Sequence, residues 1–377
     1  MHYLDHAATT PVSKKVQEVI AQTLVEYGNP SSLYQLGRRS KELMRQARLT
    51  IAKSINAQES EILFTASGSE ANNLAIQSIL QQFAVQKGHL ITSRIEHPSV
   101  MKVMQYAESI GFEVTYLPVD QFGRVSVLDV KKHLRDNTRL VSIMMINNET
   151  GSKQPIAEIG ELLSGHPAVF HTDAVQAFGQ EAIDVCQLQV DYLSASGHKI
   201  NAPKGIGFLY HRKTTPLVSL IKGGGQEQGF RAGTENIPYI VGLAQAVLEI
   251  EQQRQERMNQ QIELITYLQQ QLKHEKLSFE LNGYHVNTNS THVVNIWLKG
   301  LPSSQVIIMA DMAGVCVSAG SACSAGSLTP SPVLRAIYGE EDRRLQESIR
   351  LSFGSTSSKE DIDAFIAAIR PLAKRLL

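Results

Sequence analysis

Short apolar runs alternate with helical patterns from about residue 60 onward. The runs are Glu61–Thr65, His89–Ser93, Glu113–Leu117, Arg139–Ile146, Ala168–Thr172 and Tyr192–Ser196. Their short length and their content of β-branched residues favour strands. A helical pattern extends from Gly68 to about Phe83, and another begins near Pro98. Strands separated by helices predict an α/β fold, in which a mostly parallel sheet is covered by helices on both faces.

A long helical pattern follows this region. It extends from Pro238 to about His274, and its second half is rich in Gln, Glu and Arg, which indicates a solvated face. Beyond it, the pattern predicts a strand at Val293–Leu298 and helices at Ser304–Met312 and Lys359–Leu376. For a chain of 377 residues we therefore expect a large domain and a smaller one, joined by the long helix.

The composition argues against several classes of protein. Lys and Arg total 36, and so do Asp and Glu, so we expect no nucleic-acid surface and no basic membrane anchor. No apolar run approaches the roughly 20 residues of a membrane span, and the segment Met1–His6 has no signal-peptide pattern. The three cysteines form no C-x-x-C pair, so we expect no metal site and a reducing, cytoplasmic location.

The polar residues of interest follow the predicted strands, and ligands bind at the carboxyl ends of strands in such sheets. Gly68 and Ser69 follow the first strand and open a helix. Unpaired N–H groups and the dipole at a helix N-terminus suit a phosphate, although an ordinary capped helix with Ser69 near its N-cap would give the same pattern. Asp173 ends another strand and Gln176 follows it. A carboxylate there is costly unless it is paired, for example with a protonated ring nitrogen; the alternative is a helix cap.

Two further strand ends carry groups suited to catalysis. Lys199 follows Ser196 and His198 in a turn of small residues, and a lysine amine can form a Schiff base with a carbonyl group. The alternative is a solvated surface charge. His97 follows the second strand and could stack on a cofactor or act as an acid or base, or it could be purely structural. Asn148 closes the Arg139–Ile146 run, where a simple turn is the alternative.

Cys323 lies in the middle of a run of small residues, Ser318–Ser327. Such a run offers no apolar niche, so an accessible thiol that acts as a nucleophile is expected there. Cys186 and Cys316 stand beside apolar residues. We expect both of them to be buried as small hydrophobic side chains, which is the usual place of a free cysteine.

Taken together, these segments resemble the cysteine desulfurases, which are class V aminotransferase-like enzymes of fold type I that bind pyridoxal 5'-phosphate. The resemblance covers nearly the whole chain. It rests on Tyr3–Pro11, Gly28–Ser32, the segments around Gly68, His97, Asn148, Asp173 and Lys199, and then Arg231–Asn236, Gly320–Cys323 and Ser348–Ser352. It implies a large domain at 15–257 with a mostly parallel seven-stranded sheet, and a small α/β domain formed by 1–14 and 258–377 that carries the cysteine loop at about 318–332.

The resemblance also implies catalytic roles. Lys199 would bind the cofactor as a Schiff base and later move the Cα proton, while Cys323 would take up the sulfur as a persulfide. Asp173 would keep the pyridine nitrogen protonated, so that the ring acts as an electron sink. Gln176 would bond the phenolic oxygen of the ring, and His97 would stack on the ring and assist proton transfer.

Further residues would bind the phosphate and the substrate. The phosphate would be held by Gly68, Ser69, Ser196 and His198. Thr234 would reach the phosphate in the neighbouring subunit, which implies a homodimer. Asn148 would lie beside the cofactor and the substrate, and Arg350 would bind the substrate carboxylate, a task suited to a planar bidentate donor.

The reaction implied by the resemblance converts L-cysteine to alanine and leaves a persulfide on Cys323. The sulfur would pass to an acceptor protein, such as an iron–sulfur scaffold or a tRNA thiolase, without direct nucleic-acid binding. Two alternatives remain open. One is another enzyme of this fold, such as a selenocysteine lyase or a small-substrate aminotransferase, although an aminotransferase has no need of Cys323. The other is a silent binding module, which has no need of both Lys199 and Asp173.

Overall fold

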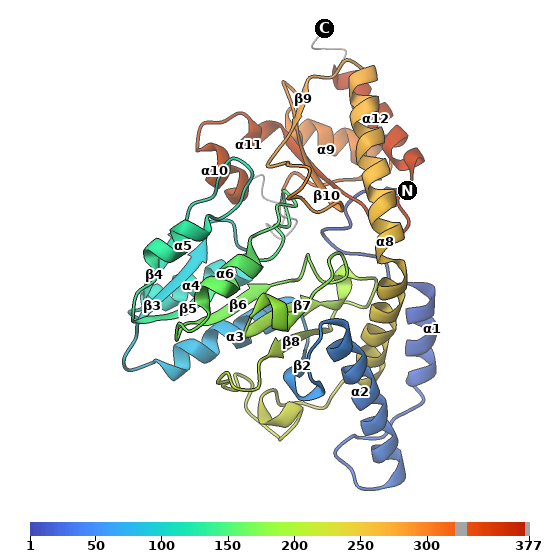
Figure 1. Ribbon diagram of the computed structural model, residues 1–377. Helices are drawn as coiled ribbons and strands as arrows, with labels where there is room; N and C mark the ends of the chain where they lie inside the picture. The colour runs from blue at the N-terminus through green and yellow to red at the C-terminus, as the bar shows by residue number, and fades with distance from the viewer. Residues whose placement is uncertain (321–329, 374–377) are drawn as a thin grey trace.

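The structure is a computed structural model that describes residues 1–320 and 330–373. Its largest element is a seven-stranded sheet (Figure 1). The strands are β2 (Ile62–Thr65), β3 (His89–Ser93), β4 (Glu113–Leu117), β5 (Thr138–Ser142), β6 (Val169–Asp173), β7 (Tyr192–Ser196) and β8 (Gly207–His211). They lie in the order β2-β8-β7-β6-β5-β3-β4, and only β8 runs antiparallel to its neighbours. The expected mostly parallel, seven-stranded α/β fold is confirmed.

Within the large sheet, the strand predictions differ from the structure in two places. β8 was not predicted, and it enters the sheet between β2 and β7. The predicted run Arg139–Ile146 is too long, because β5 ends at Ser142. Beyond that residue, the N–H groups of Ile143 and Met145 still bond carbonyls of β6, whereas the N–H of Met144 bonds the side chain of Glu96. Regular pairing thus continues on one side only before the chain turns toward Asn148.

Helices cover both faces of this sheet. They are α1 (Lys14–Thr23), α2 (Gln35–Ser54), α3 (Gly68–Gln82), α4 (Pro98–Ser109), α5 (Val127–His133), α6 (Ile156–Leu163), α7 (Val185–Leu188) and α8 (Ile237–His274), with 3₁₀ turns η1 (Glu59–Glu61), η2 (Gly197–Lys199) and η3 (Glu227–Gly229). Successive strand residues point to opposite faces, so Ile62 joins a core with α1, α2, α6 and α8, while Leu63 joins a core with α3 and α4. This alternation buries both faces of the sheet.

A second, smaller sheet is built on the far end of α8 (Figure 1). Its strands are β9 (Phe279–Leu281), β10 (Val293–Leu298) and β12 (Ser348–Ser352), in the antiparallel order β12-β10-β9. Its helices are α9 (Ser303–Met312), α10 (Pro332–Tyr338), α11 (Arg344–Glu347) and α12 (Lys359–Ala373). The N-terminal strand β1 (His2–Tyr3) pairs with β11 (Val315–Cys316), so the chain begins beside this sheet.

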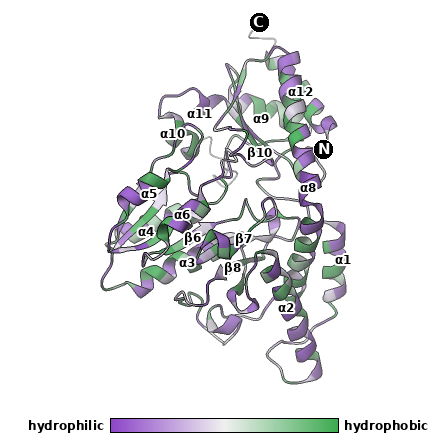
Figure 2. Cartoon of the chain, in the orientation of Figure 1, coloured by the Kyte–Doolittle hydropathy of each residue, from purple (hydrophilic) through white to green (hydrophobic). Residues whose placement is uncertain are grey.

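The long helix α8 belongs to two hydrophobic cores. Leu243 and Ile250 pack into the core beneath the large sheet, whereas Leu264 and Leu268 pack into the core of the small sheet. Figure 2 shows that α8 carries both hydrophobic and hydrophilic positions along its length, as an amphipathic helix does. One rigid element therefore holds the two sheets together. No helix in 1–320 or 330–373 combines the length and apolar character needed to cross a membrane.

The expectation for the other two cysteines was wrong for Cys186, which is exposed. It follows Asp184, the N-cap of the short helix α7, and Val185 fills the core in its place. Cys316 is only partly buried, because β11 lies at the edge of a two-stranded sheet. Cys323 lies outside the described residues.

Candidate active site

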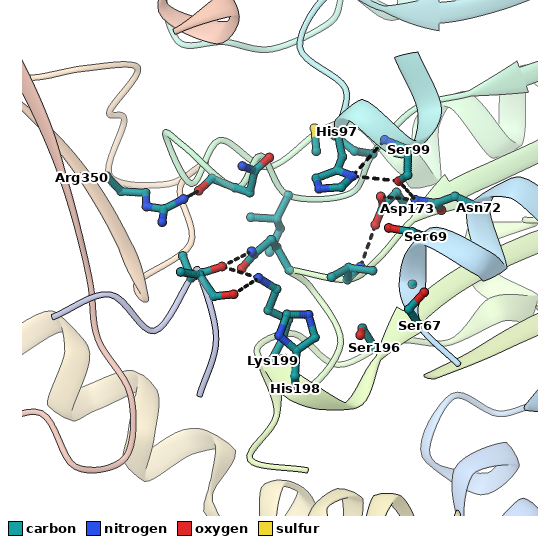
Figure 3. A pocket seen from close by; sticks show the side chains of 18 residues that line it. Ser67, Ser69, Asn72, His97, Ser99, Asp173, Ser196, His198, Lys199 and Arg350 are labelled. Carbon is teal, nitrogen blue, oxygen red and sulfur yellow. Dashed lines mark hydrogen bonds between the residues drawn. The ribbon is translucent and has the colours of Figure 1, made fainter. Parts of the chain in front are cut away.

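A pocket lies at the carboxyl ends of the parallel strands, where the large sheet faces β12 (Figure 3). The predicted site residues that line it are Gly68, Ser69, His97, Asn148, Asp173, Gln176, Ser196, His198, Lys199 and Arg350. Thr234 does not line it and is exposed between η3 and α8. The structure thus gathers residues from five strand ends and from β12 around one space.

One end of the pocket has the geometry of an anion site. The N-cap of α3 is Ser67, whose Oγ accepts from the N–H of Glu70 at 3.1 Å. The helix is therefore capped, and Ser69 stands two residues after the cap. A Cβ on Gly68 would lie 2.5 Å from Cγ2 of Val175 and 3.3 Å from Cβ of Ser196. Only glycine leaves this space, so the first turn of α3 can present its N–H groups to a ligand.

Asp173 stands at the end of β6 in a connected set of hydrogen bonds. Its Oδ2 accepts from Nδ2 of Asn72 at 2.6 Å, and its Oδ1 accepts from the N–H of Val175 at 2.9 Å. Asn72 also donates to Oγ of Ser99, which lies 2.7 Å from Nδ1 of His97. The N–H of Ser99 donates to the same Nδ1, so this nitrogen carries no proton and the neutral ring holds its proton on Nε2. The carboxylate and the imidazole are thereby fixed on one wall.

Lys199 reaches the pocket from η2, directly after β7. Its ammonium donates to the carbonyl oxygens of Ala7 and, at 2.8 Å, Ala8. These carbonyls belong to the N-terminal segment that arrives from the small sheet. The neighbouring His198 has its pKa lowered to about 4, first by burial and then by the positive charge of Lys199 and Lys204. His198 therefore offers a neutral N–H rather than a charge.

Arg350 lies at the opposite end of the pocket from Ser67, Ser69 and Ser196, and Lys199 lies between them (Figure 3). Its side chain is 1% exposed, and Nη2 is paired with Oδ1 of Asp5 at 2.7 Å. Its Nη1 donates to the carbonyl of Asn148 at 2.9 Å. Its buried Nε has no hydrogen-bond partner among the described residues. The guanidinium is held in place and keeps donors for an anion.

The order of these groups fits pyridoxal phosphate together with an amino acid. The phosphate would lie at the start of α3, where a side chain on Gly68 would block it. Asp173 would face the ring nitrogen, Lys199 the aldehyde carbon, and Arg350 the carboxylate of the substrate. Within 1–320 and 330–373, no three His, Cys, Asp or Glu side chains gather as a metal site.

Several residues that line the pocket or contact its lining were not singled out from the sequence. Asn72 stands one helical turn after Gly68, a spacing that places both on the same face of α3. Ser99 follows His97 by two residues at the start of α4 and turns its hydroxyl back to the ring. Asp5 is far from Arg350 in sequence and meets it only because the N-terminal segment lies against β12.

A second buried carboxyl group lies behind His97. Glu96 is 5% exposed, and it accepts from Oγ of Ser93 at 2.6 Å and from the N–H of Met144 at 3.0 Å. Burial raises its pKa to about 8, with a further contribution from Asp173. Glu96 therefore retains a proton at neutral pH and joins the end of β3 to the chain beyond β5.

The raised pKa of Glu96 predicts that the free energy of unfolding depends on pH. Between its ordinary pKa of 4.5 and about 8, folded Glu96 keeps a proton that the unfolded chain releases, so the free energy of unfolding falls as pH rises. The slope is at most about 1.4 kcal/mol per pH unit. Glu96→Gln should reduce the fall in stability between pH 5 and 8, measured by urea unfolding, and the exposed control Glu158→Gln should not. An unchanged slope in Glu96→Gln would contradict the assignment.

Comparison with known proteins identifies the family to which this chain belongs. Residues 2–365 match the aminotransferase class-V family model. The chain is 46% identical over 375 residues to a putative cysteine desulfurase, IscS 1, of Bacillus subtilis, covering 99% of both chains. It is 41% identical to the cysteine desulfurase IscS of Methanosarcina thermophila, covering 99% of this chain and 92% of the other.

Comparison with solved structures leads to the same family. A NifS-like protein superposes with a TM-score of 0.91 at 32% identity, covering 99% of both chains. A structure titled as SspA in complex with cysteine superposes with a TM-score of 0.81 at 37% identity, covering 95% of this chain and 100% of the other. The similarity therefore covers nearly the whole chain, and it is high enough to show that these proteins belong to one family. The chain belongs to the cysteine desulfurases, pyridoxal-phosphate enzymes of the aminotransferase class-V family.

Proposed function

We propose that this pocket holds pyridoxal phosphate on Lys199 and removes sulfur from L-cysteine, leaving alanine and a persulfide on Cys323. The observation that carries the proposal is the convergence of the Asp173 carboxylate, the Lys199 amine and the Arg350 guanidinium on one space, in that order from the ring nitrogen to the substrate carboxylate. These are the three groups that a pyridoxal-phosphate enzyme acting on an amino acid requires.

Each residue has a task that follows from its contacts. When bound, the cofactor supplies an electron sink for negative charge that develops at Cα. Asp173, held by Asn72 and Val175, keeps a negative charge where the ring nitrogen would be protonated. His97 lines the pocket with its proton on Nε2, and its ring would stack on the cofactor. Lys199, once released from the cofactor, takes the proton from Cα.

The substrate is held at the other end of the pocket. Arg350 binds the carboxylate, and Asn148 contributes the carbonyl that holds the guanidinium. The thiolate of Cys323 then attacks the substrate sulfur: an S–S bond forms, the Cβ–S bond breaks, and Cβ receives a proton. Lys199 returns a proton to Cα, alanine leaves, and Cys323 keeps the sulfur as a persulfide. An aminotransferase of the same fold would need no such thiol, and a silent module would need neither Lys199 nor Asp173.

We propose that the protein is a homodimer. Leu24, Val25, Tyr27 and Leu33, between α1 and α2, are 64–89% exposed, and a cluster of this kind on a soluble protein usually marks an interface. A hollow is lined both by this segment, at Pro30 and Ser31, and by the segment that carries Thr234, at Gln226 and Glu235. Both segments therefore lie on one face, which supports the role of Thr234 in the phosphate site of the neighbouring subunit. Sedimentation analysis tests the dimer.

Other assignments are also proposals. The two hydrophobic cores support a large domain at 15–257 and a small domain formed by 1–14 and 258–377. We propose a cytoplasmic location, where a reducing environment keeps the Cys323 thiol available. The persulfide sulfur would go to an acceptor protein, either an iron–sulfur scaffold or a tRNA thiolase. Loading Cys323 with radiolabelled sulfur and following the label into cell proteins would identify it.

The central experiment incubates the purified, cofactor-loaded protein with L-cysteine. We expect alanine in amounts equal to the sulfur released, a persulfide on the Cys323 peptide, and cofactor fixed to Lys199 after borohydride reduction. A selenocysteine lyase would act on selenocysteine and leave L-cysteine unchanged. Keto-acid-dependent amino transfer without sulfur release would instead support an aminotransferase, and a protein that binds no pyridoxal phosphate would refute the proposal.

Replacing Asp173 should slow the reaction strongly. Asp173→Asn keeps the size and an acceptor for the N–H of Val175, but it removes the charge and the acceptor for Nδ2 of Asn72. We therefore expect kcat to fall by about two to three orders of magnitude. Asp191→Asn is a control, because Asp191 is partly buried and also accepts a backbone N–H, from Phe170 at 2.8 Å, but directly precedes β7 and does not line the pocket. The rate of alanine release, measured in samples quenched at timed intervals, gives kcat for both variants. Wild-type kcat in Asp173→Asn would contradict the role.

A further inference from the structure

A buried histidine outside the pocket contacts one of the pocket residues. His292 directly precedes β10 and is 4% exposed. Its backbone carbonyl accepts from the N–H of Phe353 at 2.8 Å, so its position is tied to the end of β12. Its side chain reaches across to the large sheet, where Nε2 lies 3.0 Å from Oε1 of Gln176. His292 is thus a group of the small sheet that meets the wall of the pocket.

The hydrogen bonds around Gln176 determine where each proton lies. The carbonyl of Ala7 is only an acceptor, so the amide group that faces it at 3.0 Å must be the Nε2 of Gln176. The Oε1 of Gln176 therefore faces His292 and needs a donor. Consequently Nε2 of His292 carries a proton. Burial, followed by the positive charge of Lys199, lowers the pKa of His292 to about 3, so the neutral ring has one proton, and its Nδ1 accepts from the hydroxyl of Ser290.

This arrangement leaves the second N–H of the Gln176 amide for the pocket, which Gln176 lines. The carbonyl of Ala7 also accepts from the ammonium of Lys199. The chain of contacts therefore connects His292, through Gln176 and Ala7, to the proposed cofactor lysine. Without a donor at position 292, the buried Oε1 would have no partner, and a buried acceptor without a partner is costly. The amide would then rotate or shift from its place.

We propose that His292 is a positioning residue, which holds the amide of Gln176 so that an N–H faces the anionic ring oxygen of the cofactor. The inference rests on the proposed function, since it assigns Gln176 to that oxygen. His292 itself touches neither cofactor nor substrate. Its loss should weaken cofactor binding and slow turnover, with little effect on the KM for L-cysteine, because Arg350 and its partners are unchanged.

Two substitutions of similar length separate the hydrogen bond from packing. His292→Gln keeps an N–H donor, whereas His292→Met does not. Reconstitution of the apoprotein with pyridoxal phosphate, followed by fluorescence, gives the dissociation constant. We expect it to rise about tenfold in His292→Met, with a similar fall in kcat, and to stay within about threefold of wild type in His292→Gln. The visible absorption band of the bound cofactor should change only in the Met variant.

His89→Met is the matched control. His89 is also buried, its pKa is lowered to about 4 by burial, and it bonds the hydroxyls of Thr138 and Thr115 at 2.9 and 2.8 Å. It stands at the start of β3, whereas the pocket lies at the carboxyl ends of the parallel strands. We expect lower thermal stability of its apoprotein but unchanged cofactor affinity. Equal affinities in the two His292 variants, or equal weakening in His89→Met, would overturn the inference. Failure of the wild-type protein to bind the cofactor would instead overturn the proposed function.

Discussion

Replacing Lys199 with alanine should lower alanine release from L-cysteine by about four orders of magnitude. The same amine has two proposed tasks, since it binds the cofactor and moves the Cα proton. In the structure it is held by the carbonyls of Ala7 and Ala8, which aim it into the pocket between Asp173 and Arg350. No other lysine lines this pocket among the described residues. The variant should still fold, because Lys199 belongs to none of the hydrophobic cores of the two sheets.

Lys204→Ala is the matched control. Lys204 lies five positions further along the chain, is exposed and does not line the pocket, so its removal should leave kcat near wild type. Borohydride reduction followed by peptide mass analysis gives a second, independent measurement. The added mass of the cofactor should appear on the Lys199 peptide of the wild-type protein and of Lys204→Ala. Cofactor fixed to another lysine in wild type would show that the proposed amine is wrong.

Replacing Cys323 with serine should abolish persulfide formation while leaving cofactor binding intact. The described residues on either side of this segment are anchored at the substrate end of the pocket. Ser318 donates to Oδ2 of Asp5 at 2.7 Å, and Asp5 is paired with Arg350. Ser331 donates to the buried carboxylate of Glu149. Both flanks therefore lie beside the site where the substrate carboxylate would bind, which suits a thiol that attacks the substrate sulfur.

Cys186→Ser is the control for this variant. Cys186 is exposed on the structure and lies on α7, remote from the pocket residues. Labelling with a persulfide-selective reagent after incubation with L-cysteine should mark the wild-type protein and Cys186→Ser, and not Cys323→Ser. Sustained alanine release by Cys323→Ser at the wild-type rate would refute the proposed nucleophile. A persulfide on Cys186 would show that Cys186, and not Cys323, receives the sulfur.

Much of the pocket could be expected from the order of residues along the chain. Periodicity located strands β3, β6 and β7 closely, and the ends of parallel strands lie at one edge of a sheet. That rule alone brings His97, Asp173 and Lys199 together, and the structure places all three around one pocket. The rule works because strand direction and strand ends are local properties, which the spacing of apolar residues encodes.

Residues that do not follow the strands of the large sheet could not be placed in the pocket by this rule. Arg350 was expected from family resemblance and not from any pattern around it, since it stands within a buried strand of another sheet. Asp5 and His292 had no assigned role, and each acquires one only through a contact with a residue far away in sequence. Such contacts depend on how the two sheets are held along α8, which no local pattern specifies.

By itself, the sequence determined the α/β class, the mostly parallel sheet and the edge at which its polar strand ends gather, because these follow from local periodicity and chain direction. The tertiary structure alone decided the antiparallel insertion of β8, the pairing of Asp5 with Arg350 and the proton positions around Gln176. These depend on packing between distant segments, where a buried polar group must find its partner wherever the fold brings one within reach.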